Sequence, residues 1–355
     1  MSNIITCEQV SNGHPDKICD QIADAIVTDC LRHDPESRVA IEVLIKDHFL
    51  TIAGELTSKH QPNYRALVHK VYERIGWNKI NVVNPFLLDY DVRDLVSKQS
   101  PDIARGVDTG GAGDQGIMFG YATNETPEML PIPFAVATMF LEHLRDHPSH
   151  MFRADAKAQV SYDYDAGRIA TFLCSVQHSP DVEVDVLRPT VEQLMKQTAE
   201  EYELNTDFEV LVNPTGRFVV GGSFADTGVT GRKLACDTYG GVAHIGGGAM
   251  SGKDPTKVDR SGAYIVRKIA RDVVKKGYAD RAEVQIAYAI GVAEPVSIHV
   301  ESFGTGDDRL IEDYIRQNYD LTPRGVIERL GLLDVDYNSV SAYGHFGKPG
   351  LSWEE

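Results

Sequence analysis

The chain repeats one order of predicted elements three times, and this repetition limits its fold more than any other feature. In each repeat the apolar spacing predicts a helix, two strands joined by a short turn, and a second helix. The first helices begin near residues 14, 133 and 255, roughly 120 residues apart. The pattern predicts an α/β (α+β) fold of three α-β-β-α units with mixed or antiparallel sheets. Their apolar faces need helices or a partner subunit to cover them.

The periodicity also gives approximate bounds. We expect strands over residues 38–45, 49–56, 117–121, 159–164, 168–178, 283–290 and 296–302. We expect helices over 14–31, 62–75, 133–147, 189–203, 255–276 and 309–318. Glycine-rich loops separate the units, so we place an N-terminal domain at 1–100, a short loop at 101–110, a central domain at 111–222 and a C-terminal domain at 223–355.

Charge and cysteine content disfavour several classes of protein. Lys and Arg number 35 and Asp and Glu number 52, a formal charge of −17, so nucleic acids and anionic membranes are poor partners. Apolar runs stay below the roughly 18 residues of a membrane-spanning helix, and the segment MSNIITCEQV lacks the features of a secretory signal. Five cysteines without a CxxC pair predict buried thiols rather than disulfides or a zinc site, and a reducing, cytoplasmic location.

A first glycine-rich motif, Gly111-x-Gly113-x-x-Gly116, matches a dinucleotide-binding fingerprint. That fingerprint needs a strand before it and a helix after it. Residues 117–121 predict a strand instead, so we reject this interpretation.

A second motif, Gly247-x4-Gly252-Lys253, nearly matches a Walker A loop but lacks its preceding strand and its Ser or Thr. Asp254 is nevertheless expected to cap a helix that has Pro255 in its first turn. Lys253 and Lys257 would then flank a helix start, which favours contact with phosphate; solvated surface lysines are the alternative.

Charged residues of both signs recur beside glycines, predicted strands and helix starts. These clusters are His14-Pro15-Asp16-Lys17, Asp155-Ala156-Lys157 just before a strand, Pro214-Thr215-Gly216-Arg217-Phe218, Asp226 with Gly231-Arg232-Lys233, and Lys253 with Lys257, Asp259 and Arg260. In an acidic protein this recurrence indicates a polyphosphate bound with divalent metal, because carboxylates hold Mg²⁺ and cations take the remaining phosphate charge. For any single residue, a solvated ion pair remains the alternative.

Nine segments that span almost the whole chain resemble the S-adenosylmethionine synthetase (methionine adenosyltransferase) family, in family order. They are GHPDKICDQIADA at 13–25, KQSPDIARGVD at 98–108, GAGDQGIMFGYATNET at 111–126, RADAKAQV at 153–160, NPTGRFVVGG at 213–222, GVTGRKLACDTYGG at 228–241, GGGAMSGKDPTKVDRS at 246–261, IGVAEPVSI at 290–298 and AYGHFG at 342–347. GAGDQG and the GGGAMSGKDPTKVDRS segment are highly specific.

The resemblance implies synthesis of S-adenosylmethionine from ATP and L-methionine. The methionine sulfur attacks C5′ of ATP, the triphosphate leaves, and it is then hydrolysed to phosphate and pyrophosphate. The resemblance also implies three similar domains about a pseudo-threefold axis, two Mg²⁺ per site and K⁺ as activator. Active sites lie between two subunits, so the minimum unit is a homodimer, often paired into a tetramer. A thioether needs no general base, so positioning and electrostatic stabilisation of the leaving group should dominate.

The resemblance assigns roles residue by residue. The catalytic residues would be His14, Lys157, Arg232 and Lys253. The ATP-binding residues would be His14, Asp155, Lys157, Arg217, Phe218, Asp226, Arg232, Lys233, Ala249 and Lys253, with Lys253 and Lys257 contributed across the interface. The methionine-binding residues would be Glu55, Gln99, Asp114, Asp226 and Lys257. The metal ligands would be Asp16, Asp259 and Glu8 for Mg²⁺, and Glu42 for K⁺, unless Glu42 is simply a solvated strand residue.

One departure from the family pattern concerns the loop at 101–110. Only Thr109 and Gly110 separate Gly106-Val107-Asp108 from Gly111, whereas the family has several more residues in this mobile lid. A shorter lid predicts a less completely closed site, escape of some triphosphate, and faster product release.

Two other functions are weighed against the synthetase. One is a Mg²⁺-dependent triphosphatase or phosphotransferase without adenosyl transfer, which methionine-dependent ATP turnover would distinguish. The other is a non-catalytic nucleotide-binding relative. The joint presence of His14, Asp16, Lys157, Arg232, Lys253 and Asp259 argues against a simple binder.

Overall fold

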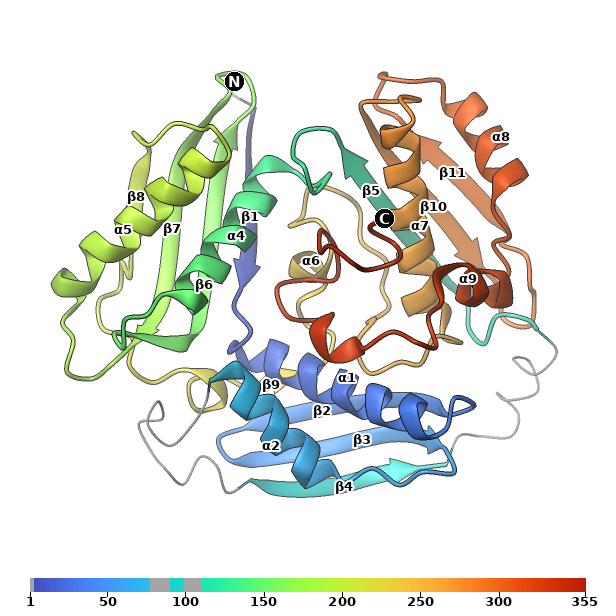
Figure 1. Ribbon diagram of the computed structural model, residues 1–355, viewed down its shortest axis with the longest axis horizontal. Helices are drawn as coiled ribbons and strands as arrows, with labels where there is room; N and C mark the ends of the chain where they lie inside the picture. The colour runs from blue at the N-terminus through green and yellow to red at the C-terminus, as the bar shows by residue number, and fades with distance from the viewer. Residues whose placement is uncertain (1–2, 77–89, 99–109) are drawn as a thin grey trace.

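The computed structural model of the chain (Figure 1) describes residues 3–76, 90–98 and 110–355. They form three separate β-sheets, and helices pack against each of them. The three α-β-β-α units expected from the sequence are therefore confirmed.

The first unit lies at the bottom of Figure 1. Its hairpin pairs β2 (Arg38–Lys46) antiparallel with β3 (Phe49–Thr57). Helix α1 (Pro15–His33) packs on β2, and α2 (Tyr64–Ile75) packs on α1. Strand β4 (Asp91–Ser97) adds to β3 in parallel.

The second unit repeats this arrangement. Its hairpin consists of β6 (Phe152–Asp163) and β7 (Arg168–His178), with α4 (Ile132–Asp146) packed on β6 and α5 (Val184–Glu201) packed on α4. Strand β8 (Glu209–Val212) joins β7 in parallel, as β4 joins β3.

The third unit has the hairpin of β10 (Arg281–Tyr288) and β11 (Ser297–Glu301), with α7 (Val258–Lys275) packed on β10 and α8 (Asp308–Asn318) packed on β11. Helix α9 (Pro323–Leu330), which the sequence pattern did not predict, packs against α7. Within the part of the chain that the structure describes, the other short helices are η2 (Gly222–Phe224), α6 (Leu234–Asp237) and η3 (Tyr337–Ser339).

The strand that precedes each unit is hydrogen-bonded into the sheet of the next unit. Strand β1 (Ile4–Val10) pairs with β6, β5 (Gly116–Thr123) pairs with β10, and β9 (Gly228–Val229) pairs with β2, all antiparallel. The exchange is cyclic, so every sheet contains residues from another unit. The sequence predicted a strand at 117–121 but neither β1 nor β9, and it gave no partner for any of them.

Local sequence explains the ends of the first two helices. His14 caps α1 by accepting a hydrogen bond from the backbone of Asp16, and Asn63 caps α2 in the same way from Ala66. Helix α2 ends where predicted, at Gly76, whose φ of 87° is the left-handed conformation that glycine adopts without strain.

The predicted apolar face of α1 is confirmed. The members of this face, Ile18, Ile22, Ala25 and Ile26, are 0–3% exposed. The polar positions of α1 from Asp16 to Thr28 are also buried, because the C-terminal part of the chain packs on its other side (Figure 1), whereas Asp29 is half-buried and His33 is exposed. Helix α1 is therefore enclosed between the first sheet and the third unit.

Two elements, β6 and α5, begin earlier in the chain than the sequence predicted, because of tertiary contacts. Strand β6 begins at residue 152 rather than 159, so Asp155 and Lys157 lie within a strand and not before one, because β1 and β7 both pair with this segment. Helix α5 begins at Val184 and contains Pro189, which was expected at its first turn. Its buried face continues to Leu187 on the N-terminal side of the proline, and this packing offsets the lost hydrogen bond.

Large apolar side chains are exposed on two of the sheets. Leu44, Phe49, Leu95 and Ile117 are 45–65% exposed and project from the strands of the first and third sheets. The alternation along β2 is strict here, since Ile41 and Val43 are buried and Glu42 is exposed. Among the described residues, the helices include none that is both long and apolar enough to span a membrane.

All five cysteines are free and buried, as expected from their number and spacing. Burial raises the pKa of Cys7, Cys30 and Cys236 to about 12, so these thiols stay protonated at neutral pH.

Candidate active site

His14 lies at the N-terminal end of α1 and is almost completely buried. Its Nδ1 accepts a hydrogen bond from the backbone N–H of Asp16 at 3.2 Å, so the proton of the neutral ring is on Nε2. Burial, followed by the charges of Lys233 and Lys157, lowers the pKa of His14 to about 3. At neutral pH this side chain is therefore an uncharged hydrogen-bond donor.

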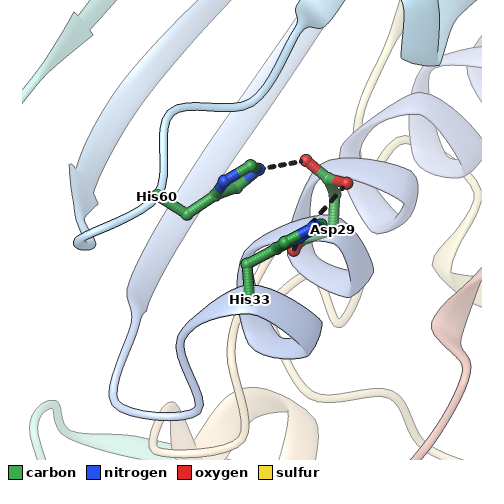
Figure 2. A group of neighbouring side chains, drawn as sticks. All are labelled: Asp29, His33 and His60. Carbon is green, nitrogen blue, oxygen red and sulfur yellow. Dashed lines mark hydrogen bonds and ion pairs between the residues drawn. The ribbon is translucent and has the colours of Figure 1, made fainter.

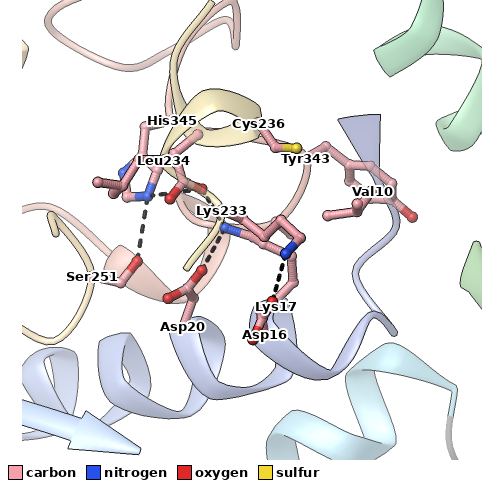
Figure 3. Close-up of polar contacts among 12 residues, drawn as sticks. Val10, Asp16, Lys17, Asp20, Lys233, Leu234, Cys236, Ser251, Tyr343 and His345 are labelled. Atoms are coloured by element: carbon pink, nitrogen blue, oxygen red, sulfur yellow. Dashed lines mark hydrogen bonds and ion pairs between the residues drawn. The ribbon is translucent and has the colours of Figure 1, made fainter. Parts of the chain in front are cut away.

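Asp16 is 1% exposed and lies beside two cations. Its Oδ2 accepts a hydrogen bond from Nζ of Lys233 at 2.6 Å, and Nε of Arg232 lies 3.7 Å from Oδ1 (Figure 3 shows Asp16 and Lys233). Its Oδ1 also accepts a hydrogen bond from the backbone N–H of Val229 at 2.9 Å. The loop after β9 therefore brings both basic residues of the Gly231-Arg232-Lys233 cluster to the start of α1.

Asp155 and Lys157 extend this group from β6. Asp155 is buried and accepts a hydrogen bond from the backbone N–H of Gly222 at 2.7 Å. Burial raises its pKa to about 6, opposed by that hydrogen bond and by the charge of Lys157. Asp226 is exposed, and its charge acts on both Asp155 and His14. The sequence-predicted residues around His14 therefore share one electrostatic environment.

Arg217 and Phe218 lie on the loop that follows β8, and Arg217 is exposed. This loop is held by His178, a residue that the sequence pattern did not indicate. Its buried ring accepts a hydrogen bond from the backbone N–H of Phe218 at 3.0 Å through Nε2, and the backbone N–H of His178 donates to the Phe218 carbonyl at 2.8 Å. His178 is the last residue of a predicted strand, and a period of two cannot indicate such a role.

A second group of predicted residues lines a cavity of about 280 Å³ on the exposed face of β2 and β3. Its walls contain Glu42, Glu55, Ala249 and Lys253, together with Thr230 and Ser251, which the sequence analysis did not select. Thr230 and Ser251 belong to the two glycine-rich segments quoted for the family resemblance, so those segments already contained them.

Lys253 donates a hydrogen bond to Asp259 across 2.6 Å at one end of this cavity. A Cβ on Gly248 would lie 2.1 Å from Oδ1 of Asp259, and one on Gly116 would lie 3.5 Å away. The two glycine-rich motifs of the sequence therefore meet at this carboxylate. Asp114 is exposed in the first of these motifs, two residues before Gly116.

The helix start expected at Asp254 is wrong. Helix α7 begins at Val258, with Lys257 at the N-cap position. Asp254 is fully buried and accepts hydrogen bonds from the backbone of Val39 at 2.7 Å and of Thr256 at 2.9 Å, so it fixes the loop to β2. Lys257 donates to the same carboxylate at 2.9 Å.

Two basic residues from the predicted clusters lie in the core instead of the site. Lys17 is fully buried and donates hydrogen bonds to Asp20 and Asp237, and these carboxylates raise its pKa although burial alone would lower it. Arg260 is fully buried and forms an ion pair with Asp24 of α1. Both are structural pairs, because buried charges require partners.

Buried polar contacts continue from Lys17 and Asp237 to His345 and Ser251; Figure 3 shows Lys17, His345 and Ser251. Nδ1 of His345 and the hydroxyl of Tyr264 form a hydrogen bond at 2.9 Å. Nε2 of His345 lies 3.3 Å from the hydroxyl of Ser251. Nε2 of His345 is also 3.8 Å from Asp237. A polar network in the core therefore connects the start of α1 to a cavity wall.

Asp16 and Glu42 lie on opposite sides of the first sheet. Asp16 belongs to α1, which packs on the buried face, whereas Glu42 projects from the opposite face. Glu8 is exposed on β1, opposite Gln159 in the second sheet. Gln99 and residues 101–109 of the predicted lid lie outside the described residues.

The donor atoms present are suited to metals and phosphate. Carboxylate oxygens such as those of Asp16 and Asp259 are the ligands that Mg²⁺ prefers, and each already lies beside a lysine. Lysine and arginine side chains that converge on such carboxylates are typical of enzymes that bind a polyphosphate together with divalent cations.

The fold and these residues match one family throughout. Models of the S-adenosylmethionine synthetase N-terminal, central and C-terminal domains match residues 2–101, 109–218 and 220–355. The chain belongs to the S-adenosylmethionine synthetase family.

Two relatives and one solved structure are similar to the chain over nearly its whole length. The chain is 45% identical over 370 residues to S-adenosylmethionine synthase of Sorangium cellulosum (strain So ce56), covering 99% of this chain and 87% of the relative. It is 43% identical over 376 residues to the enzyme of the same name from Treponema denticola, covering 99% and 96%. A solved structure described as an unusual S-adenosylmethionine synthetase from Campylobacter jejuni superposes with a TM-score of 0.92 at 36% identity, covering 99% and 96%.

The activity is that of the family. The chain is a methionine adenosyltransferase, which forms S-adenosylmethionine from ATP and L-methionine and hydrolyses the triphosphate to phosphate and pyrophosphate. The family uses divalent and monovalent metal ions. The sequence-based prediction of family and reaction is thus confirmed.

Proposed function

We propose that each active site is assembled from two subunits, with the residues around His14 from one and the Lys253 cavity from the other. The observation that carries this proposal is that Asp16 and Glu42 lie on opposite sides of the first sheet in a single chain. Both groups adjoin exposed surfaces, and apolar residues such as Leu44 and Phe49 surround the cavity face. A second copy of the chain is the proposed cover, so the working unit is at least a homodimer.

The first half-site holds the triphosphate. Lys157, Arg232 and Lys233 carry the charges that bind phosphate oxygens. His14 donates a hydrogen bond from Nε2 to the oxygen that leaves C5′, where negative charge develops in the transition state. Asp226 and the Arg217–Phe218 loop bind the ribose and the adenine side of ATP, and Asp155 fixes the loop at Gly222 beside them.

The second half-site holds methionine. Glu55 and Asp114 would bind the amino acid group, and Lys257 would assist. A cavity of about 280 Å³ suits a ligand as small as an amino acid. In the reaction a bond forms between the methionine sulfur and C5′ while the bond from C5′ to the triphosphate oxygen breaks, and both electrons of that bond leave with the triphosphate. Sulfur carries no proton, so no residue must act as base.

Metal ions fit the carboxylates of both half-sites. We assign two Mg²⁺ per site, held by Asp16 and Asp259 with Glu8 as a further ligand, and K⁺ beside Glu42. Bound Mg²⁺ would neutralise charge on the triphosphate. Lys233 and Lys253 now occupy these carboxylates and would shift to phosphate oxygens when nucleotide binds.

The reaction is tested by incubating the protein with ATP, Mg²⁺ and K⁺, with and without methionine. S-adenosylmethionine, phosphate, pyrophosphate and triphosphate are quantified by mass spectrometry. We expect S-adenosylmethionine with matching phosphate and pyrophosphate only when methionine is present. ATP hydrolysis that is independent of methionine, without S-adenosylmethionine, would instead indicate a triphosphatase or phosphotransferase.

The shared site is tested by mixing two inactive variants, His14→Asn and Lys253→Ala. A heterodimer of these chains contains one site with both half-sites intact, so refolding the mixture should restore up to about a quarter of wild-type activity. Absence of any rescue, with heterodimers demonstrated by mass spectrometry, would show that one chain supplies the complete site.

A further inference from the structure

A second cluster of side chains suited to metal binding lies away from the active site. Asp29 and His33 belong to the last turns of α1, and His60 belongs to the segment between β3 and α2 (Figure 2). One ligand atom from each of these residues lies within 4.8 Å of the other two. Two imidazole rings and a carboxylate therefore converge from two separate segments of the first unit.

Asp29 is the centre of this cluster. Its Oδ2 lies 2.7 Å from Nε2 of His60, and its Oδ1 lies 3.7 Å from Nδ1 of His33. Nδ1 of His33 also lies 2.8 Å from the backbone carbonyl oxygen of Asp29. The side chains of Asp29 and His60 are 23% and 25% exposed, so an ion could reach them from solvent and still be partly enclosed.

The two imidazole rings stack, with centroids 4.0 Å apart and planes 12° apart. Nitrogen lone pairs lie in the ring plane, so two stacked rings cannot both direct a lone pair at one ion. One ring must turn, and His33 has the space to do so because its side chain is 55% exposed. The hydrogen bond between His60 and Asp29 would be replaced by their shared bonds to the ion.

The surroundings favour a cation. The cluster lies at the C-terminal end of α1, where the helix dipole is negative. Asp34 and Glu36 follow directly in the chain. Lys59, which precedes His60, directs its ammonium group to Glu36 at 2.8 Å, and Arg32, which precedes His33, pairs with Asp336 at 2.8 Å.

We propose that Asp29, His33 and His60 bind one transition-metal ion of the Zn²⁺ type. Two imidazole nitrogens and one carboxylate suit Zn²⁺ or Co²⁺, whereas Mg²⁺ prefers oxygen ligands alone. Three protein ligands leave a fourth position for water, in keeping with the partial exposure of the cluster.

This metal site is distinct from the metal-binding carboxylates of the active site. Asp29 lies 13 residues after Asp16 on the same helix, which corresponds to about 20 Å along its axis. The ion would join the end of α1 to the segment that follows β3. It would therefore stabilise the first unit without contacting nucleotide or methionine.

The experiment is a calorimetric titration of the full-length, chelator-treated protein with ZnCl₂ in excess Mg²⁺, which occupies oxygen-only sites. We expect wild-type protein to bind one zinc ion per chain that is lost, or weakened roughly tenfold or more, in Asp29→Asn, His33→Asn and His60→Asn. The thermal midpoint should rise with zinc in the wild type and not in these variants.

His69→Asn is the matched control, because His69 is another exposed histidine of the first unit, 3.2 Å from Glu73 on α2. It should bind zinc and gain thermal stability like the wild type. Zinc-free thermal midpoints show whether each variant is folded, and a misfolded variant still leaves the other two as tests. Equal zinc binding by the three variants and the wild type, or no zinc binding by the wild type, would overturn the proposal.

Discussion

The ammonium group of Lys233 lies 2.6 Å from Oδ2 of Asp16, although 217 residues separate them in the chain. The proposed phosphate ligand thus neutralises the proposed metal ligand while no substrate is bound. Lys253 and Asp259 form the same kind of pair in the other half-site. Binding of nucleotide with metal would exchange partners in both pairs, so the charges of Asp16 and Asp259 are compensated before substrate arrives.

This pairing predicts the behaviour of Lys233→Ala. Removing the ammonium group leaves Asp16 more available to a metal ion, so nucleotide-free affinity for Mn²⁺ should increase on the order of tenfold, while turnover falls. Electron paramagnetic resonance titration with Mn²⁺ measures this affinity. Lys46→Ala, which removes a lysine outside the site, should change neither quantity. Unchanged or weaker Mn²⁺ binding in Lys233→Ala would contradict the partner exchange.

His14→Asn separates the two roles of His14. Asparagine is a good N-cap, so the free energy of unfolding should change little, whereas His14→Ala should lower it by about 1 kcal/mol. Neither replacement reaches the position of Nε2, so kcat should fall roughly 100- to 1000-fold in both. Denaturant unfolding and steady-state kinetics measure these effects. Wild-type kcat in His14→Asn would show that Nε2 does not donate to the leaving group.

Lys253→Ala should lower kcat roughly 100-fold or more and ATP affinity much less. The charge of Lys253 matters most as negative charge develops on the triphosphate, which is a property of the transition state. Single-turnover kinetics and equilibrium ATP binding separate the two effects. Lys196→Ala, at a surface pair on α5, is the control. A loss of affinity without a loss of turnover would make the assigned role wrong.

Asp155→Asn should change the pH dependence of stability. Burial raises the pKa of Asp155 from its ordinary value of 3.8 to about 6, so the folded state binds the proton more tightly than the unfolded state. The cost of ionising the buried carboxylate therefore appears as pH rises from 3.8 and is complete above pH 6. Relative to the wild type, the variant should gain up to about 3 kcal/mol of unfolding free energy between pH 4 and pH 7. Parallel pH dependence in the two proteins would contradict this.

Arg260→Ala should destabilise the protein by about 3 to 5 kcal/mol, because it leaves Asp24 charged and buried without its partner. Arg260 also donates to the backbone carbonyl of Met250 at 2.6 Å, so the loop before α7 should loosen. Arg324, whose side chain is 84% exposed, pairs with Glu328 on the surface of α9. Arg324→Ala should lower the free energy of unfolding by less than about 0.5 kcal/mol. Thermal unfolding compares the two variants. Equal small effects would show that the buried pair contributes little.

The sequence predicted the parts of the fold that depend on neighbouring residues. The apolar face of α1, the end of α2 at Gly76 and the alternation around Glu42 follow from periodicity and local conformation, and all were confirmed. Strand β9 contains only two residues and exists because β2 lies beside it, so no local pattern could reveal it. The start of β6 was misplaced for the same reason.

For the site, residue types gave the chemistry but not the arrangement. Recurring lysines, arginines and aspartates indicated phosphate and metal, and the resemblance gave each a role. Charge alone could not distinguish Lys233, which reaches Asp16, from Lys17 and Arg260, whose charges are paired in the core. Nor could it show that Asp16 and Glu42 lie on opposite sides of the first sheet, which depends on the path of the whole chain.

The cyclic exchange of strands sets the order in which the chain can fold as it leaves the ribosome. The first sheet cannot be complete until β9, at residues 228–229, has been synthesised, although its hairpin ends at Thr57. The third sheet must wait for β11, which ends at Glu301. Only the central sheet, with β1, β6, β7 and β8, can close once Val212 has emerged. The middle unit should therefore mature first, while the hairpin of the first unit stays incomplete and open to chaperones during much of translation.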